Sequence, residues 1–385
     1  MELSTLTRHF VSHFQKKPQF LARAPGRVNI IGEHTDYNGG CVLPCAIDRE
    51  IYMLGALRSD RVIRAHALDF DQSTSFSVDD PDRARTAPWS NYLRGVFQQL
   101  SMRGIQVPGL DLLIHGTIPP GAGLSSSAAL EVATAELAKL ASNVKLDPLE
   151  VARLCQQAES EFVGVQCGIM DQFASVFGVR NRALFLNCSN LECRTVELPR
   201  QTRILICDSG VRRSLDQSSY NQRHLECNQA LDLIRSEMPE LQNLCELIPT
   251  QLQDFRPLLP DPLYQRVRHV ITENQRVIDS VQSLKNGDAA SFGRLLFASH
   301  ESLRNDFEVS CADLDLLVDL AARLDGTLGA RMTGGGFRGC TINLVEEQQM
   351  EQFSARMKEG YQKHAGRQLP VHACVPWDGV TSRRL

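Results

Sequence analysis

The 385-residue sequence lacks the features that mark membrane, secreted and nucleic-acid-binding proteins. No apolar run approaches the ~20 residues of a transmembrane helix. The first residues, MELSTLTRHFVSHFQKK, have no apolar core of the kind found in a signal peptide. Lys and Arg total 41 against 45 Asp and Glu, which gives a net charge of −4 and no basic excess. We therefore expect a protein that binds neither membrane nor nucleic acid.

Cysteine is present, but its spacing lacks a metal-binding pattern. The 12 cysteines contain no CxxC pair, so a structural zinc site is weakly supported. Several lie in apolar runs, such as Cys207 in ILICD, where a thiol packs as a small apolar side chain. Reduced thiols without a signal peptide predict a cytoplasmic protein.

Length and periodicity predict two domains of mixed helix and strand. A chain of 385 residues suits two domains, and we place them at 1–200 and 201–385. Short strand-like runs rich in Val, Ile and Leu dominate the first half. The second half is more helical, with apolar residues at helical spacing over 262–285.

Capping and periodic patterns predict several individual elements. We expect a helix over 90–103 and another from an Asp147–Pro148 start to about Phe162. A strand over 204–208 precedes a polar loop and a helix near 217–236. Asp288 and Asp313 each suit the start of a later helix.

The most informative run is PPGAGLSSSAAL, residues 119–130. A glycine-rich loop that opens into a helix offers backbone N–H groups and the positive end of the helix dipole to a phosphate. No Lys follows the glycines, which excludes a Walker A loop, and a Ser replaces the third Gly of the dinucleotide fingerprint. The alternative is an N-capped helix after a tight turn.

A second run, APGRVNIIGEHTDYNGG over 24–40, concentrates ionisable side chains in a loop. Arg27, Glu33, His34 and Asp36 lie within ten positions of one another. Such a loop suits a small polar ligand such as a sugar, whose hydroxyls need paired donors and acceptors. A solvated charged loop is the alternative, and a metal-only site is disfavoured because HExxH spacing is missing.

A third run, ESEFVGVQCGIMDQFAS over 159–175, places a carboxylate among apolar residues. Gly164 and Gly168 interrupt the helix, and Asp171 follows. A buried carboxylate is costly unless paired, and a cation such as Arg27 would keep it ionised. Alternatively, Asp171 serves only as the N-cap of the next segment.

Together with RMTGGGFRGC at 331–340, these three runs resemble the motifs of the GHMP kinase superfamily and, within it, the galactokinase family. The resemblance spans residues 20–345 in order. It implies an α+β GHMP kinase fold, with an N-terminal domain like ribosomal protein S5 domain 2 and a ferredoxin-like C-terminal domain. The active site would lie between them.

The resemblance also implies ATP-dependent phosphorylation of the C1 hydroxyl of galactose, with galactose 1-phosphate and ADP as products. ATP and Mg²⁺ would be the cofactors. The partners would be ATP and the sugar, and the protein would be a monomer or a weak homodimer.

Residue roles follow from the same resemblance, position by position. Asp171 would act on the C1 hydroxyl as base or orienting acceptor, and Arg27 would neutralise Asp171 and the migrating phosphoryl group. The sugar would be held by Glu33, His34, Thr35, Asp36, Gly168 and Tyr220. The triphosphate would be cradled by Gly121, Ala122, Gly123, Leu124, Ser125, Ser126 and Ser127. Ser127 and Glu159 would be Mg²⁺ ligands, and Trp89 would flank the adenine.

Two positions depart from the family pattern. Arg338 replaces a glycine of the last motif, and Ser219 replaces the usual Glu before Tyr220. If position 338 requires positive φ, Arg338 carries about 1 kcal/mol of strain, and Arg338→Gly should stabilise the protein slightly. We favour that account over one in which Arg338 contacts the nucleotide or sugar.

Two other functions stay open at this point. One is a sibling sugar-1-kinase for another hexose, an N-acetylhexosamine or a pentose. The other is a catalytically silent galactose and ATP sensor. The intact GLSSSAA run and the presence of Asp171 and Arg27 favour an enzyme.

Overall fold

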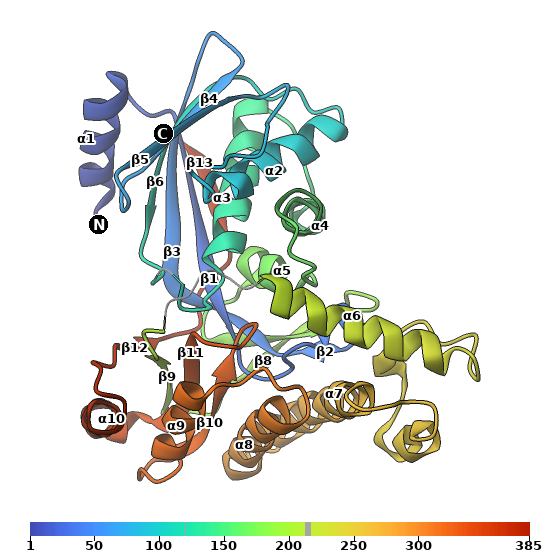
Figure 1. Cartoon of the computed structure of the whole chain (residues 1–385). Helices are drawn as coiled ribbons and strands as arrows, with labels where there is room; N and C mark the ends of the chain where they lie inside the picture. Colours follow the sequence, from blue (N-terminus) through green and yellow to red (C-terminus); the bar gives the residue numbers. More distant parts are fainter. Residues whose placement is uncertain (120, 212–216) are drawn as a thin grey trace.

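A six-stranded sheet forms the core of the N-terminal part of this computed structural model, which describes residues 1–119, 121–211 and 217–385 (Figure 1). The strand order is β13-β1-β3-β6-β4-β5, and only β4 and β6 pair in parallel. The strands are β1 (Phe20–Asn29), β3 (Pro44–Leu57), β4 (Val62–Ala67), β5 (Gln72–Ser77), β6 (Leu110–Gly116) and β13 (Thr381–Arg384).

Helices cover both faces of this sheet, which explains why β1 is buried along nearly its whole length. Helix α1 lies on one face and inserts Leu6 and Phe10, while the other N-terminal helices lie on the opposite face (Figure 1). The helices are α1 (Leu3–Phe14), α2 (Ser90–Met102), α3 (Ser126–Ser142), α4 (Pro148–Gln157) and α5 (Met170–Phe177).

The predicted helix from Asp147 begins as expected but changes its winding. The Glu150 side chain accepts from the Asp147 backbone N–H at 2.8 Å in a capping box. The α-helix ends at Gln157 and continues as a π-helix, η2 (Ala158–Val163), closed by Gly164 at φ +94°. A π-helical turn in an α-helix is a common device at functional sites. Here it carries Glu159.

The C-terminal sheet has four antiparallel strands in the order β10-β11-β9-β12. Its strands are β9 (Thr202–Asp208), β10 (Thr327–Thr333), β11 (Cys340–Glu346) and β12 (Val371–Cys374). The first and third strands of this unit lie at the centre, and helices precede β10 and β12. This is a ferredoxin-like arrangement, which confirms the predicted α+β fold.

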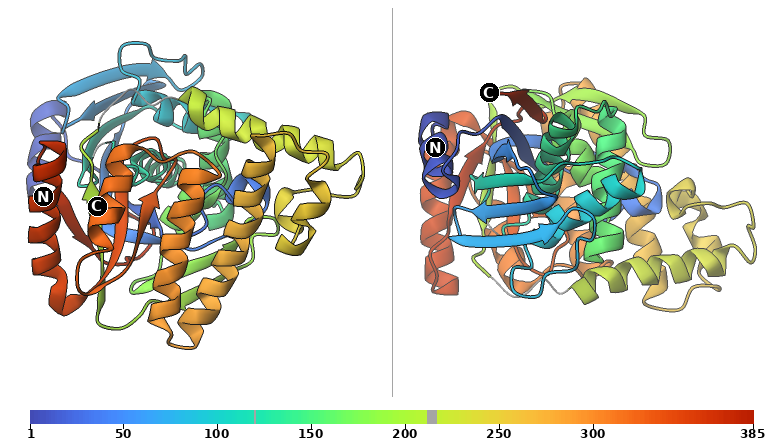
Figure 2. Two further views of the ribbon diagram at one scale, coloured as in Figure 1. Left: turned by 60° about the horizontal axis from the view of Figure 1, so that its bottom comes forward. Right: turned by 90° about the horizontal axis from the view of Figure 1, so that it is seen from above.

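The helices of the second half match the predicted pattern closely. Asp288 caps α8 by accepting the Ser291 N–H at 2.9 Å, and Asp313 lies in the first turn of α9. Helices α7 and α8 lie side by side (Figure 2). The helices are α6 (Gln217–Ile234), α7 (Leu263–Lys285), α8 (Ala289–Asn305), α9 (Ala312–Ala321) and α10 (Met350–Ala365).

A small third sheet and four short 3₁₀ helices make up the remaining regular structure of the described residues. The sheet contains β2 (Cys41–Val42), β7 (Arg182–Asn187) and β8 (Cys193–Glu197) in that order. The 3₁₀ helices are η1 (Asp36–Asn38), η3 (Leu244–Glu246), η4 (Pro249–Phe255) and η5 (Glu347–Gln349). Pro120 of the glycine-rich loop and residues 212–216 of the polar loop lie outside the described residues.

The division at residue 200 stays a prediction. Strand β9 opens the second sheet at Thr202, but the last strand, β13, pairs with β1 in the first sheet. Among the described residues, no helix is both long enough and apolar enough to cross a bilayer.

Candidate active site

Arg27 and Asp171 form a bidentate ion pair between β1 and α5. The Arg27 Nε and Nη2 atoms each lie 2.6 Å from one Asp171 carboxylate oxygen. Arg27 is 4% exposed, and Nη1 also donates to the Gly123 carbonyl at 2.9 Å. Burial alone would lower the pKa of Arg27, but Asp171 and Glu33 outweigh it and raise that pKa. A permanently charged guanidinium thus lies between the carboxylate and the glycine-rich loop.

The glycine-rich loop opens directly into α3, as the sequence predicts. Gly121, Gly123 and Ser125 all have positive φ, and Ser125 is the residue before the first turn of the helix. The first N–H groups of a helix have no intrahelical partners, so they are available to an anion. The Ser125 hydroxyl donates to Asp171, which ties this loop to the ion pair. A role for residues 121–127 in holding phosphate stays a proposal.

Ser127 and Glu159, the predicted metal ligands, contact each other. The Ser127 side chain lies beside the Glu159 carboxylate, and the Gln172 amide donates to that carboxylate at 2.7 Å. Burial and then Asp171 raise the pKa of Glu159 to about 7. A hydroxyl and a carboxylate are hard oxygen donors, and Mg²⁺ is usually held by one or two such groups plus substrate phosphates. The residues present therefore fit Mg²⁺.

A second buried carboxyl group, that of Glu131, lies next to the predicted metal ligands. Gln172 donates to Glu131 at 3.0 Å as well as to Glu159, and both Glu131 and Gln172 are completely buried. Burial, and then the Glu159 charge, raise the pKa of Glu131 well above its ordinary value. Sequence reasoning assigned no role to Glu131 or Gln172, although Glu131 directly follows the run at 119–130 and Gln172 lies within the run at 159–175.

The other predicted sugar residues gather around the loop at 32–40. His34 Nδ1 lies 2.8 Å from the Tyr37 hydroxyl, and the His34 ring packs 5.5 Å from the Tyr220 ring. Burial lowers the pKa of His34 well below its usual value, so the ring is neutral. Its Nε2 atom is buried and lies near the backbone of Gly335, but it makes no hydrogen bond of ordinary geometry among the described residues. A sugar hydroxyl would satisfy it.

Gly168 lies directly against Asp36. A Cβ atom at position 168 would clash with the Asp36 carboxylate, so only glycine leaves room there. Burial, followed by the charges of Asp171 and Glu33, raises the pKa of Asp36 to about 7. Asp36 is therefore a carboxyl group that the folded protein keeps partly protonated near neutral pH.

This raised pKa predicts a pH dependence of stability. Aspartate in an unfolded chain titrates near pH 4, so the folded protein binds an extra proton between about pH 4 and 7. Its stability then falls as the pH rises across that window and stays lower above it. In Asp36→Asn this term is absent, so the ligand-free melting temperature should fall less between pH 5 and 8 than in the wild type. Parallel melting curves for the two proteins would contradict this.

Glu33 and Thr35 make contacts that hold the loop in place. One Glu33 oxygen accepts the Gly334 N–H at 2.8 Å and the Thr333 hydroxyl at 3.1 Å, and it pairs with Arg331 at 3.3 Å. The Thr35 hydroxyl lies 3.0 and 2.8 Å from two loop carbonyl oxygens. We therefore propose that Thr35 shapes the loop and does not contact the sugar.

Trp89 lies apart from these contacts, at the N-terminus of α2. Its indole N–H donates to Gln72 of β5 at 3.0 Å, and its ring packs partly on the N-terminal core. Its predicted place beside the adenine stays a proposal.

Two further polar residues beneath the loop were missed by sequence reasoning. His269 and Glu273 lie on α7, are completely buried, and contact the backbone of residues 32–33. The available signal was a polar pair four residues apart within the apolar stripe of 262–285.

The prediction that Arg338 has a strained backbone with positive φ is wrong. Positive φ falls on its two neighbours, Phe337 at 63° and Gly339 at 95°, and not on Arg338 itself. The turn therefore places its left-handed residues on either side of position 338, where a side chain is tolerated.

Arg338→Gly should consequently fail to stabilise the protein. Glycine gives the unfolded chain more conformations, which costs about 0.4–1 kcal/mol where the native φ suits any residue. We expect an unchanged or slightly lower melting temperature. A higher melting temperature would restore the strain account.

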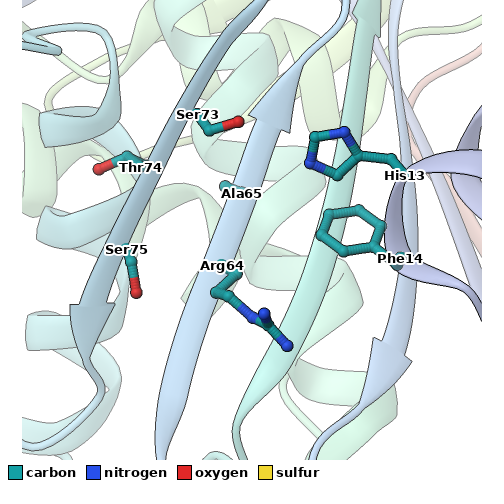
Figure 3. A pocket seen from close by; sticks show the side chains of 7 residues that line it. All are labelled: His13, Phe14, Arg64, Ala65, Ser73, Thr74 and Ser75. Carbon is teal, nitrogen blue, oxygen red and sulfur yellow. The ribbon is translucent and has the colours of Figure 1, made fainter.

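A groove elsewhere on the molecule takes no part in this site. It lies between α1, β4 and β5 (Figure 3) and has a volume of about 310 Å³. Its lining includes His13, Phe14, Arg64 and Ser73, none of which is a predicted site residue.

Comparison with known proteins defines the class first. The family model of the GHMP kinases N terminal domain matches residues 91–179, and that of the GHMP kinases C terminal domain matches 280–363. The mevalonate kinase of Methanococcus jannaschii shares the fold, with a TM-score of 0.67 at 18% identity over 94% of this chain and 99% of that one. The fold is that of a GHMP kinase.

Closer relatives define the family. The galactokinase galactose-binding signature matches residues 8–57. The galactokinase of Chloroflexus aggregans is 44% identical, covering 99% of this chain and 97% of its own. The galactokinase of Lactococcus lactis, solved with galactose, is 35% identical with a TM-score of 0.95 over 98% of this chain and 99% of that one. The chain belongs to the galactokinase family, which confirms the resemblance seen in its motifs.

Proposed function

We propose that this protein transfers the γ-phosphoryl group of ATP to the C1 hydroxyl of galactose, giving galactose 1-phosphate and ADP. The observation that carries the proposal is the buried Arg27–Asp171 pair, which Ser125 ties to the glycine-rich loop. The loop at 32–40 lies close to this pair, since the charges of Glu33 and Asp36 both act on Arg27. The proposed phosphate site and the proposed sugar site would thus adjoin one ion pair.

We assign the acceptor role to Asp171. Arg27 and Ser125 hold its carboxylate in one orientation, from which an oxygen can accept the proton of the C1 hydroxyl. Arg27 also adds positive charge where the phosphoryl group would pass. Phosphoryl transfer depends mainly on positioning and on charge stabilisation, and these residues supply both.

We assign the metal to Ser127 and Glu159. Mg²⁺ bound there would offset phosphate charge during transfer. Gln172 fixes the orientation of the Glu159 carboxylate through its hydrogen bond of 2.7 Å. The helix N-terminus at Ser126 would hold the phosphates by backbone N–H groups.

We assign sugar recognition to His34, Asp36 and Tyr220, with Glu33 in a supporting role. The Nε2 atom of the neutral His34 ring, which makes no hydrogen bond of ordinary geometry among the described residues, would bind a sugar hydroxyl. The Asp36 carboxyl group would accept a hydrogen bond from a sugar hydroxyl when ionised and donate one when protonated. The Tyr220 ring packs against the rings of His34 and Tyr37 and would line the same sugar site.

A panel of free sugars tests the proposal. Initial rates of ADP release would be measured with galactose, glucose, an N-acetylhexosamine and a pentose at saturating Mg·ATP. We expect kcat/KM for galactose to exceed the others clearly. Preference for another sugar would favour a sibling sugar-1-kinase, and sugar binding without ADP release would favour a sensor.

We further propose a cytoplasmic location and a monomeric or weakly dimeric state. All 12 cysteines are free thiols, which suits a reducing compartment. Light scattering across a concentration series tests the oligomeric state.

A further inference from the structure

Two buried polar side chains of α7 lie directly beneath the sugar loop. His269 and Glu273 are four residues apart, so they share one face of the helix, and each has no exposed surface. Buried polar groups at this depth require partners. Both find them in the backbone of the loop, more than 230 residues away in the sequence.

Glu273 binds the loop through its backbone N–H groups. One carboxylate oxygen accepts from Gly32 at 2.9 Å and from Glu33 at 3.4 Å, and Ser299 of α8 donates to the same oxygen at 2.7 Å. Arg276 donates to the other oxygen at 2.7 Å. Burial would raise the pKa of Glu273, but Arg276 and nearby cations outweigh it and lower that pKa to about 2. The carboxylate is therefore ionised.

His269 binds the same segment through a carbonyl group. Its Nε2 atom lies 3.1 Å from the Glu33 carbonyl oxygen, which can only accept, so Nε2 carries the proton. The N–H and the C=O of Glu33 are thus both held by side chains of one helix. Hydrogen bonds to a charged group such as Glu273 are stronger than neutral ones.

The loop has no room to move toward the helix. Gly32 has φ +100°, and a Cβ atom there would lie 2.8 Å from the Val277 side chain of α7. The loop backbone therefore packs directly on α7. The hydrogen bonds to Glu273 and His269 fix its position and orientation relative to this helix. Glu33 and His34, which follow Gly32, project from this fixed backbone.

We propose that Glu273 and His269 are positioning residues that set the affinity for the sugar by holding the backbone of residues 32–34. The inference rests on the proposed role of this loop in sugar binding. Neither residue touches the sugar. Without their contacts, the backbone of residues 32–34 and the His34 ring would sample several orientations, and part of the binding free energy would be spent in ordering them.

Glu273→Gln is the principal test, because it keeps the size of the side chain and removes its charge. We expect KM for galactose to rise about tenfold, with KM for ATP changed less than twofold and a smaller change in kcat. The upward shift in melting temperature caused by galactose should shrink, and the shift caused by Mg·ADP should persist. The matched control is Asp279→Asn, an exposed carboxylate on the same helix, which should behave as the wild type.

His269 gives an independent test with a built-in rescue. Gln at this position can place an amide N–H near the site of Nε2, whereas Ala cannot. We expect His269→Ala to raise KM for galactose and His269→Gln to recover most of the loss. Ser299→Ala removes one donor to Glu273 without removing the carboxylate, and it should give a smaller change in the same direction. Ser299→Ala replaces Glu273→Gln as the test variant if Glu273→Gln does not fold.

Equal changes in the two KM values would overturn the proposal, as would a lower melting temperature with unchanged KM values and unchanged ligand shifts. Failure of Gln to improve on Ala at position 269 would also count against it. These outcomes are separate from failure of the proposed function, in which the wild-type protein itself would not phosphorylate galactose.

Discussion

Asp171→Asn should nearly abolish turnover and leave nucleotide binding intact. The substitution keeps the shape of the side chain but removes its charge and one of the acceptors for Arg27. Loss of a positioned proton acceptor typically costs about 10²–10⁴ in rate. The nucleotide should still bind, because in our proposal the loop at 121–127 holds the phosphates with its own backbone and hydroxyl groups.

The experiment compares kcat with the dissociation constant for ADP in the same preparation. An intact ADP affinity shows that the variant is folded, which matters because Arg27 stays buried with a weaker partner. Asp79→Asn is a suitable control, since Asp79 also pairs with an arginine, Arg61, but on the surface. A variant that keeps the wild-type kcat would remove Asp171 from the mechanism.

The second large effect is expected at the metal site. Ser127→Ala and Glu159→Gln should each shift the Mg²⁺ dependence of activity to higher concentration and lower kcat. Substitutions in the outer shell of a metal site cost about 10–100-fold in metal affinity, so a direct ligand should cost at least about tenfold. Glu159 should show the larger change, because it contributes charge as well as an oxygen atom.

Mg²⁺ titrations at saturating ATP and galactose measure this effect. Glu161→Gln is the matched control. Glu161 lies two residues away in the same π-helical turn, is exposed, and accepts a hydrogen bond from the Gln99 amide at 2.7 Å. Titration curves of both test variants that overlay the wild-type curve would place the metal elsewhere.

Most features of this site could be predicted from short local motifs. The loop–helix junction at 119–130 and the pairing of Arg27 with Asp171 depend on chemistry that short runs display: glycines before a helix, and a carboxylate that needs a cation. The structure brings Ser127 and Glu159 together in the same way. Capping residues such as Asp147 and Asp288 predicted the starts of their helices.

The contacts that brace the site could not be read from short runs. Glu273 meets Gly32 across 241 residues, and only the packing of α7 under the loop brings them together. The π-helical turn at Glu159 was hidden because its residues suit an ordinary helix equally well. The strain expected at Arg338 was wrong because φ depends on how a turn is wound, and here the neighbours take the left-handed positions.

The measurement that tests the central claim most directly is identification of the product by phosphorus NMR. Purified protein would be incubated with Mg·ATP and galactose, with Asp171→Asn in parallel. Our account predicts that the wild type forms galactose 1-phosphate and ADP in equal amounts, and that the variant forms almost none. ATP hydrolysis without a sugar phosphate, or a phosphate on a carbon other than C1, would contradict it.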